Sequence, residues 1–307
     1  MGADRLMTAK PGYGSPLRRF PFQRSSAKYD GIFPELVDRR AFFDRVVLTI
    51  RGRRKKLSGT AVINRTNLPI GGEKSHYARV ERGVVAATGN SFDLRYGPLR
   101  LQKIVPPLVL VLRSDRTPIS AENALAAVKL LCEKGWTASV SQVEITFDLT
   151  GTSVGFFERN VLTPARRFKT LGEGRLTHYI GGRTSPWQIR VYDKAPGLVR
   201  FEFVGRRAFL RAHGIHRPAH LVLLRDIDLR PRVQLRELDK GQMKTLEESI
   251  DEDYRRRVLA RWDRDLPLRV FLPAVKKYFS AVPDELVVPS PVEERLRRMQ
   301  WQLVWDR

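Results

Sequence analysis

The sequence is poor in cysteine and in long apolar runs. Cys132 is the one cysteine among 307 residues, which excludes a disulfide framework and a cysteine zinc site and favours a reducing compartment. The longest apolar run, residues 104–112, contains two prolines and falls short of the ~18 residues that span a bilayer. No apolar stretch precedes Pro11, so we expect no secretory signal and a soluble, cytoplasmic protein.

Two motifs of common enzyme classes are missing as well. The sequence has no GxxxxGK followed by Ser or Thr and no HExxH, so we expect neither P-loop ATP hydrolysis nor zincin chemistry. Three histidines lie close together at His213, His216 and His220. Gly214 and Pro218 interrupt the helix that would align them, so we interpret this segment as a loop.

Positive charge is what the chain has in excess. It carries 56 Lys and Arg against 33 Asp and Glu, a formal net charge of +23, and 42 of the 56 are arginines. A field of this sign attracts polyanions, of which nucleic acid is the commonest inside cells. No segment has the pattern of a basic amphipathic membrane anchor. The composition therefore predicts a nucleic-acid partner and no membrane partner.

Periodicity divides the chain into four segments. Residues 1–40 lack periodicity and predict a basic flexible arm, and the alternation within residues 41–118 predicts a β-rich N-terminal lobe. Residues 119–230, which begin with a clear helix pattern at 120–135, predict an α+β catalytic lobe. Residues 231–307 predict a helical C-terminal region. Short links between strands favour antiparallel neighbours, so we expect an α+β fold with largely antiparallel sheets, packed helices and a two-lobed catalytic region.

Three short segments carry the chemistry. Residues 141–149, 187–194 and 199–204 alternate apolar with polar side chains, which predicts strands that bury one face. If they share a sheet, their polar faces form one surface suited to a phosphodiester; it holds Glu144, Asp148, Arg190, Tyr192, Lys194, Arg200 and Glu202. A separate basic run after another predicted strand, expected to face backbone phosphates, contains Arg53, Arg54, Lys55 and Lys56.

The carboxylates on these strands are candidate metal ligands. Glu144 and Asp148 stand two pleats apart, about 13 Å along a strand, which is too far for one ion. Glu144 with Glu202 on another strand makes a better pair, because cross-strand neighbours lie about 5 Å apart. Clusters of carboxylates alone favour Mg²⁺ or Mn²⁺. The alternative is that these acids simply form ion pairs with Arg190 and Arg200.

Two tyrosines are candidate nucleophiles. Tyr192 stands between Arg190 and Lys194, cations that would stabilise a phenolate. Tyr179 is a rival, because the glycines and Arg183 that follow it would admit a phosphate closely. The alternative for either residue is a half-buried strand tyrosine that packs on a neighbour.

The ordered set VEITFDLTG (143–151), THYIGGRTSPWQIRVYDK (177–194) and VRFEFVGRRAFLRAHGI (199–215) resembles the rolling-circle replication initiators of the trans-acting Rep family. This family includes plasmid Rep proteins, filamentous-phage replication initiation factors and some relaxases. The resemblance spans about 75 residues, from the start of the first segment to the end of the last. One position departs from the family: its acid strand often reads Arg-x-Asp, and Gln142 and Glu144 occupy those places here.

The resemblance implies a metal-dependent enzyme that nicks and joins DNA. Tyr192, with Tyr179 in reserve, would cleave one strand at an origin, stay covalently attached to the 5′ phosphate and later rejoin the ends. Glu144 and Glu202, with Asp148 as a weaker candidate, would hold Mg²⁺ or Mn²⁺.

The same resemblance implies the DNA contacts and the partners. Phosphates would be bound by Arg183, Arg190, Lys194 and Arg200. The partners would be origin DNA, single-stranded or in a supercoiled or cruciform plasmid or phage replicon, together with a second copy of the chain and a host helicase. Two alternatives stay open on the residues alone: a non-catalytic DNA-binding protein and an RNA-binding module.

Overall fold

The computed structural model describes residues 32–54, 62–69, 77–98, 106–115, 117–171, 177–249, 267–270, 272–273 and 286–303. These residues belong to one compact unit that spans residues 31–307. Most of the predicted basic arm lies outside the described residues, as do Lys55 and Lys56 of the predicted basic run.

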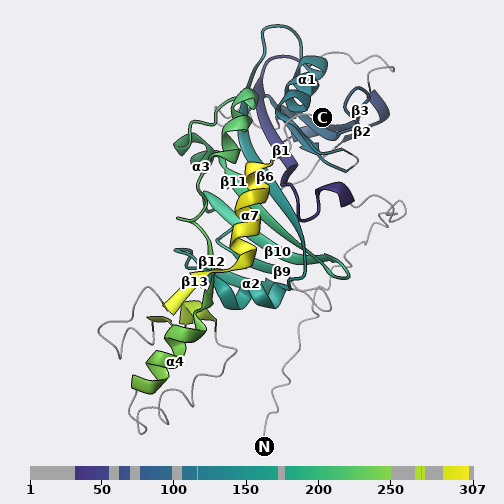
Figure 1. Ribbon diagram of the computed structural model, residues 1–307. Coiled ribbons are helices and arrows are strands. Elements are labelled where there is room, and N and C mark those ends of the chain that lie inside the picture. Colours follow the sequence, from purple (N-terminus) through teal and green to yellow (C-terminus); the bar gives the residue numbers. More distant parts are fainter. Residues whose placement is uncertain are drawn as a thin grey trace, which may run out of the picture. The chain divides into compact units, whose positions relative to one another are not determined.

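A ten-stranded antiparallel sheet forms the centre of this unit (Figure 1). In spatial order its strands are β2 (Val62–Pro69), β3 (Tyr77–Val85), β4 (Ser91–Pro98), β5 (Leu108–Arg113), β1 (Phe42–Arg51), β6 (Thr137–Thr150), β11 (Leu198–Arg206), β10 (Trp187–Ala195), β9 (Thr177–Ile180) and β8 (Phe168–Leu171). The predicted α+β class with largely antiparallel strands is confirmed. Strands of the predicted 41–118 and 119–230 lobes share this sheet, because β1 pairs with both β5 and β6.

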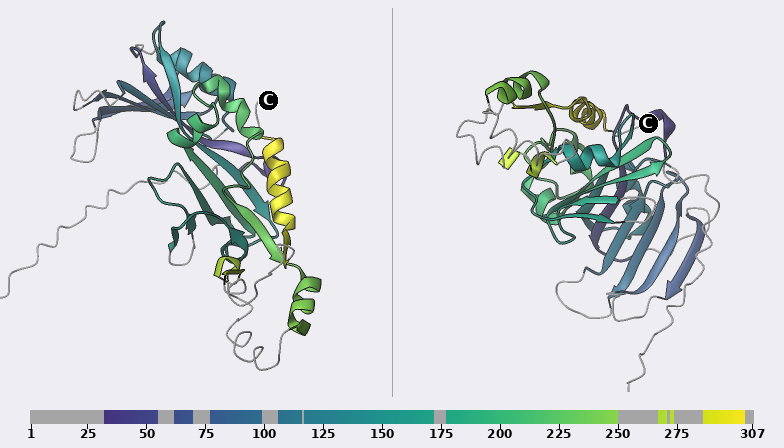
Figure 2. Two further views of the ribbon diagram at one scale, coloured as in Figure 1. Left: turned by 90° about the vertical axis from the view of Figure 1, so that its left-hand side faces the viewer. Right: turned by 90° about the horizontal axis from the view of Figure 1, so that it is seen from below.

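Helices cover one face of the sheet. The left view of Figure 2 shows α1 and α7 on the same side of the strands. Their apolar side chains join one core with the alternate residues Val143, Ile145 and Phe147 of β6. The elements packed on this face are α1 (Ala121–Leu131), α2 (Val154–Asn160), α3 (Arg207–Ala212), the 3₁₀ helix η2 (Pro218–Arg225) and α7 (Pro291–Trp301).

The ends of α1 follow the sequence signals. The Ser120 side chain accepts a hydrogen bond from the backbone N–H of Asn123, so it satisfies one of the free donors of the first turn. The stripe that includes Val128 and Leu131 is fully buried, and Cys132 is buried beside it. The helix predicted at 120–135 is therefore confirmed, although it ends at Leu131.

The C-terminal segment combines helices with short strands. It holds α4 (Lys240–Ser249) and α7 together with β12 (Gln234–Leu238) and β13 (Val287–Pro289). β12 lies between β13 and β7 (Val161–Leu162) in a second sheet of three strands. In the described part of the chain, no helix is long and apolar enough to cross a membrane.

The N-cap of α7 provides a test of local stability. The Ser290 Oγ accepts a hydrogen bond from the backbone N–H of Glu293 at 3.1 Å, and both residues are buried. We expect Ser290→Ala to lower the free energy of unfolding by about 1 kcal/mol, measured by urea titration. Ser290→Thr keeps the oxygen and serves as the control. Equal losses in the two variants would contradict the capping role.

Candidate active site

The face opposite the helices carries the predicted polar residues. β6, β11 and β10 are adjacent strands, so the three segments do share one sheet. Arg190 stands directly opposite Glu202 and Tyr192 directly opposite Arg200. Arg200 in turn stands opposite Asp148. The register therefore brings the acids, the tyrosine and two arginines onto one surface.

Arg190 lies between two buried carboxylates. Its Nη2 is 2.8 Å from Glu144 Oε2 and its Nε is 2.9 Å from Glu202 Oε2, while the carboxylate residues are 2% and 3% exposed. Neither contact is aligned as a hydrogen bond, so these arginine nitrogens and Glu202 Oε2 are buried without one. Burial lowers the pKa of Arg190, but Glu202 and Glu144 raise it further, so the net shift is upward.

The Tyr192 hydroxyl donates a hydrogen bond to Glu202. The Oη–Oε1 distance is 2.6 Å, and Tyr192 itself is half-buried. Burial and the negative charge of Glu202 together raise the pKa of Tyr192, so the phenol is neutral at physiological pH. Burial also raises the pKa of Glu202, although Arg190 and the Tyr192 hydrogen bond offset part of the rise. A neutral tyrosine therefore donates to a buried carboxylate whose pKa is raised.

Arg200 and Asp148 form a separate buried pair. The arginine Nε and Nη2 donate to the two carboxylate oxygens at 2.6 and 2.7 Å, and both residues are 1% exposed. The guanidinium lies over the Phe42 ring at 5.5 Å, and Phe42 packs with Phe33 of the segment around the 3₁₀ helix η1 (Pro34–Leu36). A phosphate cannot reach Arg200 while this cover and this pair are in place.

The two glutamates are diagonal neighbours, which differs from the direct pair expected. Glu144 stands opposite Val204, and Glu202 stands opposite Thr146. Diagonal positions are about 7–8 Å apart, and the guanidinium of Arg190 occupies the space between them.

This arrangement does not fit a divalent cation. Among the described residues, no group of three or more His, Cys, Asp or Glu side chains converges. The positive charge between Glu144 and Glu202 belongs to Arg190, and Asp148 binds Arg200. Binding of Mg²⁺ or Mn²⁺ at these residues stays a prediction, because it requires Arg190 to move.

Arg45 is a site residue that the sequence interpretation missed. It stands opposite Glu144 on β1, and its Nη1 donates to Glu144 Oε1 at 3.1 Å. Gln142 donates to the same oxygen at 2.9 Å. An arginine from the neighbouring strand and a glutamine from the same strand thus both bind Glu144. Arg45 directly precedes the apolar segment 46–50, but only the pairing of β1 with β6 connects it to the site.

The remaining predicted DNA-binding residues lie apart from this network. Arg53 is exposed, and Arg54 pairs with Glu81 at 2.7 Å beyond the far end of β1. Six strand residues, about 20 Å, separate Arg45 from Arg51 at that end. Lys194 is half-buried near the end of β10. Arg183 lies at the β8–β9 edge of the sheet and lines a pocket there with Tyr179, which itself stands directly opposite Arg190 on β10.

A second basic cluster continues this face of the sheet across β3, β4 and β5. Asp93 lies 3.1 Å from Arg82, 4.0 Å from Arg95 and 2.6 Å from Arg113. Burial raises the pKa of Asp93, but the arginines lower it more, so the net shift is downward. With three arginines around one carboxylate, the cluster has a positive formal charge.

One serine motif also requires an explanation. Residues 151–155 read GTSVG and match the pattern GxSxG at a strand-to-helix turn. The Ser153 Oγ accepts a hydrogen bond from the backbone N–H of Phe156 and so caps α2. The described residues of the pocket beside it include no histidine that would activate the serine. Ser153 is therefore interpreted as a helix cap.

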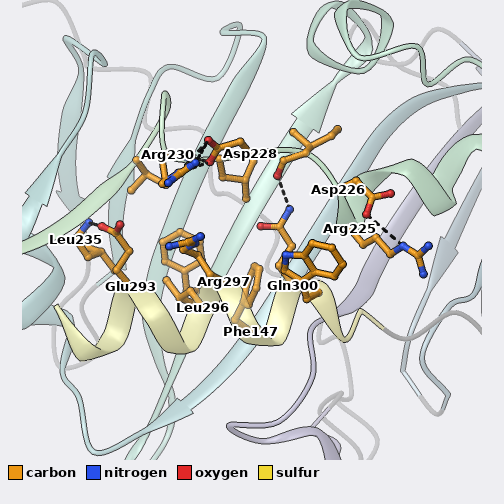
Figure 3. A pocket seen from close by; sticks show the side chains of 15 residues that line it. Phe147, Arg225, Asp226, Asp228, Arg230, Leu235, Glu293, Leu296, Arg297 and Gln300 are labelled. Carbon is orange, nitrogen blue, oxygen red and sulfur yellow. Dashed lines mark hydrogen bonds and ion pairs between the residues drawn. The ribbon is translucent and has the colours of Figure 1, made fainter. Parts of the chain in front are cut away.

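A smaller pocket of about 220 Å³ lies beneath α7 on the helix-covered face (Figure 3). Phe147 and Leu296 form part of its apolar lining, and Gln300 donates to the carbonyls of Leu224 and Ile227. Charged residues at its rim pair locally, as Arg230 does with Asp228 at 2.7 Å. It lies on the opposite side of the sheet from Tyr192.

Comparisons with known proteins give a distant structural similarity. No family model and no curated protein matches the chain. A solved structure of a rolling circle replication initiator protein from Geobacillus stearothermophilus is similar with a TM-score of 0.40 and 13% identity, covering 71% of this chain and 91% of that one. Because this similarity is distant, we base the function on the residues of the site.

Proposed function

We propose that this protein initiates rolling-circle replication by nicking and rejoining one DNA strand at an origin through a 5′-phosphotyrosyl intermediate on Tyr192. The observation that carries this proposal is the hydrogen bond from the Tyr192 hydroxyl to the buried Glu202. A phenol is a weak nucleophile until a base removes its proton, and Glu202 is within reach to do so.

In the nicking step, Tyr192 Oη attacks the phosphorus while Glu202 accepts the phenolic proton. The new bond joins Oη to phosphorus, the bond from phosphorus to the 3′ oxygen breaks, and the leaving oxygen takes a proton from solvent. Rejoining reverses these changes, with a 3′ hydroxyl as nucleophile and Glu202 returning the proton to Tyr192. The phosphotyrosyl bond conserves the energy of the broken linkage, so no nucleotide hydrolysis is needed.

Arginines supply the positive charge for the phosphate. The side chains of Arg190 and Arg45 are 24% and 37% exposed, so both reach the surface above the carboxylates. A guanidinium binds phosphate oxygens with paired N–H donors and stabilises the charge of the transition state. The cluster around Asp93 extends this positive face across the sheet and supports a path for DNA.

No step above uses a divalent cation. The prediction that Mg²⁺ or Mn²⁺ binds Glu144 and Glu202 is tested by nicking assays with Mn²⁺ and with EDTA. Self-association and recruitment of a host helicase remain predictions from the sequence resemblance.

The direct test of the proposal is to trap the adduct. The full chain is incubated with a labelled pool of single-stranded oligonucleotides of random sequence, which removes the need to know the origin. We expect a denaturation-resistant protein–DNA adduct, with the 5′ phosphate mapped to Tyr192 by peptide sequencing. An adduct on Tyr179 would contradict the proposal. The absence of any adduct, both with Mn²⁺ and with EDTA, would also contradict it.

A second candidate is a DNA-binding protein without catalytic activity. It is favoured by the pairing of Glu144, Glu202 and Asp148 with arginines, as a structural network would require. Such a protein would bind the same pool tightly and form no adduct. Tighter binding of single-stranded RNA than of DNA would instead indicate an RNA-binding module.

The pH dependence of nicking tests the role of Glu202. The carboxylate must be deprotonated to accept the proton, so the rate rises as pH increases through its pKa. Because burial raises that pKa from 4.5, we expect the acidic limb of the rate profile to lie above this value. Glu202→Gln should lower the rate about 10²–10⁴-fold and remove the limb. A variant with the same limb as the parent would exclude Glu202 as the base.

A further inference from the structure

A basic pocket lies at the β8–β9 edge of the sheet and plays no part in the nicking step. We call it the edge pocket; it is about 560 Å³ in volume, within the range of small-molecule sites. Its described lining contains four cations and no carboxylate. The lining residues are Arg166, Arg167, Phe168, Lys169, Leu171, Tyr179, Gly181, Gly182, Arg183 and Gln188.

The described residues provide no carboxylate partner for the four cations of the edge pocket. Within the described ranges, the side chains of Arg166, Arg167, Lys169 and Arg183 make no ion pair or hydrogen bond. The arginines of the active site differ, since Arg190 and Arg200 are each paired with carboxylates. All four residues are exposed, so water screens their mutual repulsion, and an anion placed among them is attracted by four nearby positive charges.

Two glycines keep the edge pocket accessible. A Cβ on Gly182 would lie 3.3 Å from Arg167 Nη1 and 3.2 Å from Ser185 Oγ, so a side chain there would displace the arginine. Gly181 adopts a φ of +88°, and a Cβ on it would lie 3.0 Å from the Trp187 carbonyl. Backbone without side chains therefore forms the wall where a ligand would approach.

The edge pocket adjoins the nucleophile. Tyr179 is half-buried in its wall and stands opposite Arg190 on β10. Tyr192 stands opposite Thr177, so the two tyrosines are diagonal neighbours about 7–8 Å apart on one face. A strand with its phosphate at Tyr192 therefore extends directly to the pocket.

We infer that the edge pocket binds one unstacked nucleotide of single-stranded DNA, next to the phosphate that Tyr192 attacks. The phosphate of this nucleotide lies among the four cations, and its base stacks on Tyr179. A base inside a duplex is stacked and paired, so the pocket selects single strands. The inference rests on the proposed function only for the position of the neighbouring phosphate.

The cations are tested by binding, without chemistry. Affinity for a short fluorescein-labelled oligothymidylate is measured in the full chain carrying Tyr192→Phe. A triple variant, Arg166→Ala with Lys169→Ala and Arg183→Ala, is compared with a control that loses three exposed charges elsewhere, Arg207→Ala with Arg211→Ala and Arg217→Ala. We expect the pocket variant to bind the oligonucleotide at least about tenfold more weakly than the control. The slope of log affinity against log salt concentration should be smaller in magnitude by about 0.7 for each phosphate contact that is lost. Equal affinities and slopes would overturn the inference.

The aromatic contact is tested in the same assay. Tyr179→Ala should weaken binding by roughly 5- to 150-fold, the loss of one stacked base, and Tyr179→Phe should leave it unchanged. The same variants should change affinity for a blunt duplex much less. Equal effects on single strand and duplex would overturn the inference. The adduct assay is independent of these measurements, so a failure of the edge pocket and a failure of the nicking proposal are distinguishable.

Discussion

Tyr192→Phe is expected to abolish the protein–DNA adduct and leave DNA binding intact. Under the proposed function, the substitution removes the oxygen that attacks the phosphorus and keeps the aromatic ring. No neighbouring group on that strand replaces it, because Arg190 and Lys194 are cations. The measurement is the adduct band on a denaturing gel, beside affinity for the same oligonucleotides.

The matched control for this prediction is Tyr179→Phe, which removes a hydroxyl from the diagonal neighbour of Tyr192. We expect it to form the adduct at the parental level. Because Tyr192→Phe leaves Glu202 Oε1 without its donor, a stability loss of about 1–3 kcal/mol accompanies it, and circular dichroism must show that the variant is folded. An adduct that survives Tyr192→Phe and disappears in Tyr179→Phe would reverse the assignment of the nucleophile.

Asp148→Ala is expected to have the largest effect on stability, a loss of about 3–5 kcal/mol in the free energy of unfolding. It leaves the guanidinium of Arg200 buried beneath Phe42 without the carboxylate that binds it through two hydrogen bonds. A charge that cannot reach water is far more costly than one at the surface. Urea titration of the purified variants measures the loss.

Asp93→Ala is the control for this second prediction. Asp93 is also buried, but the side chains of its partners Arg82 and Arg113 are 42% and 31% exposed and regain hydration when it is removed. We expect a loss of about 1 kcal/mol or less. The double replacement Asp148→Leu with Arg200→Met should recover most of the stability, since no charge is then buried. Equal losses of unfolding free energy in Asp148→Ala and Asp93→Ala would show that burial of the Arg200–Asp148 pair does not increase the cost of removing its carboxylate.

The sequence predicts the faces of the central strands well and their register poorly. Alternation assigned Glu144 and Glu202 to the polar face of neighbouring strands, which the structure confirms. A shift of two residues keeps every side chain on its face, so alternation cannot distinguish a direct pair from a diagonal one. Alternation therefore could not decide between a metal-binding pair and the alternative of ion pairs with Arg190 and Arg200, which are the contacts that the structure shows.

Residues contributed by distant segments were not predictable. Arg45 reaches Glu144 because β1 pairs with β6, and a bulge between Phe43 and Arg45 sets that register. The edge pocket likewise combines the segment around Arg167 with the turn after Tyr179. Local periodicity reports which face a residue occupies and contains no information on which strands meet.

The central position of β1 also has a consequence for how the protein is made. During synthesis β1 can pair with β5 once residue 113 has emerged, but its other neighbour, β6, follows only at residues 137–150. Contacts this far apart in the chain form late and raise the contact order, which slows folding. Arg45 can contact Glu144 only after β1 has paired with β6. Glu202 lies on β11, which follows β6 in the chain and pairs with it later still. A partly folded chain therefore lacks the contacts that join Tyr192, Glu202, Arg190 and Glu144 until the sheet is complete.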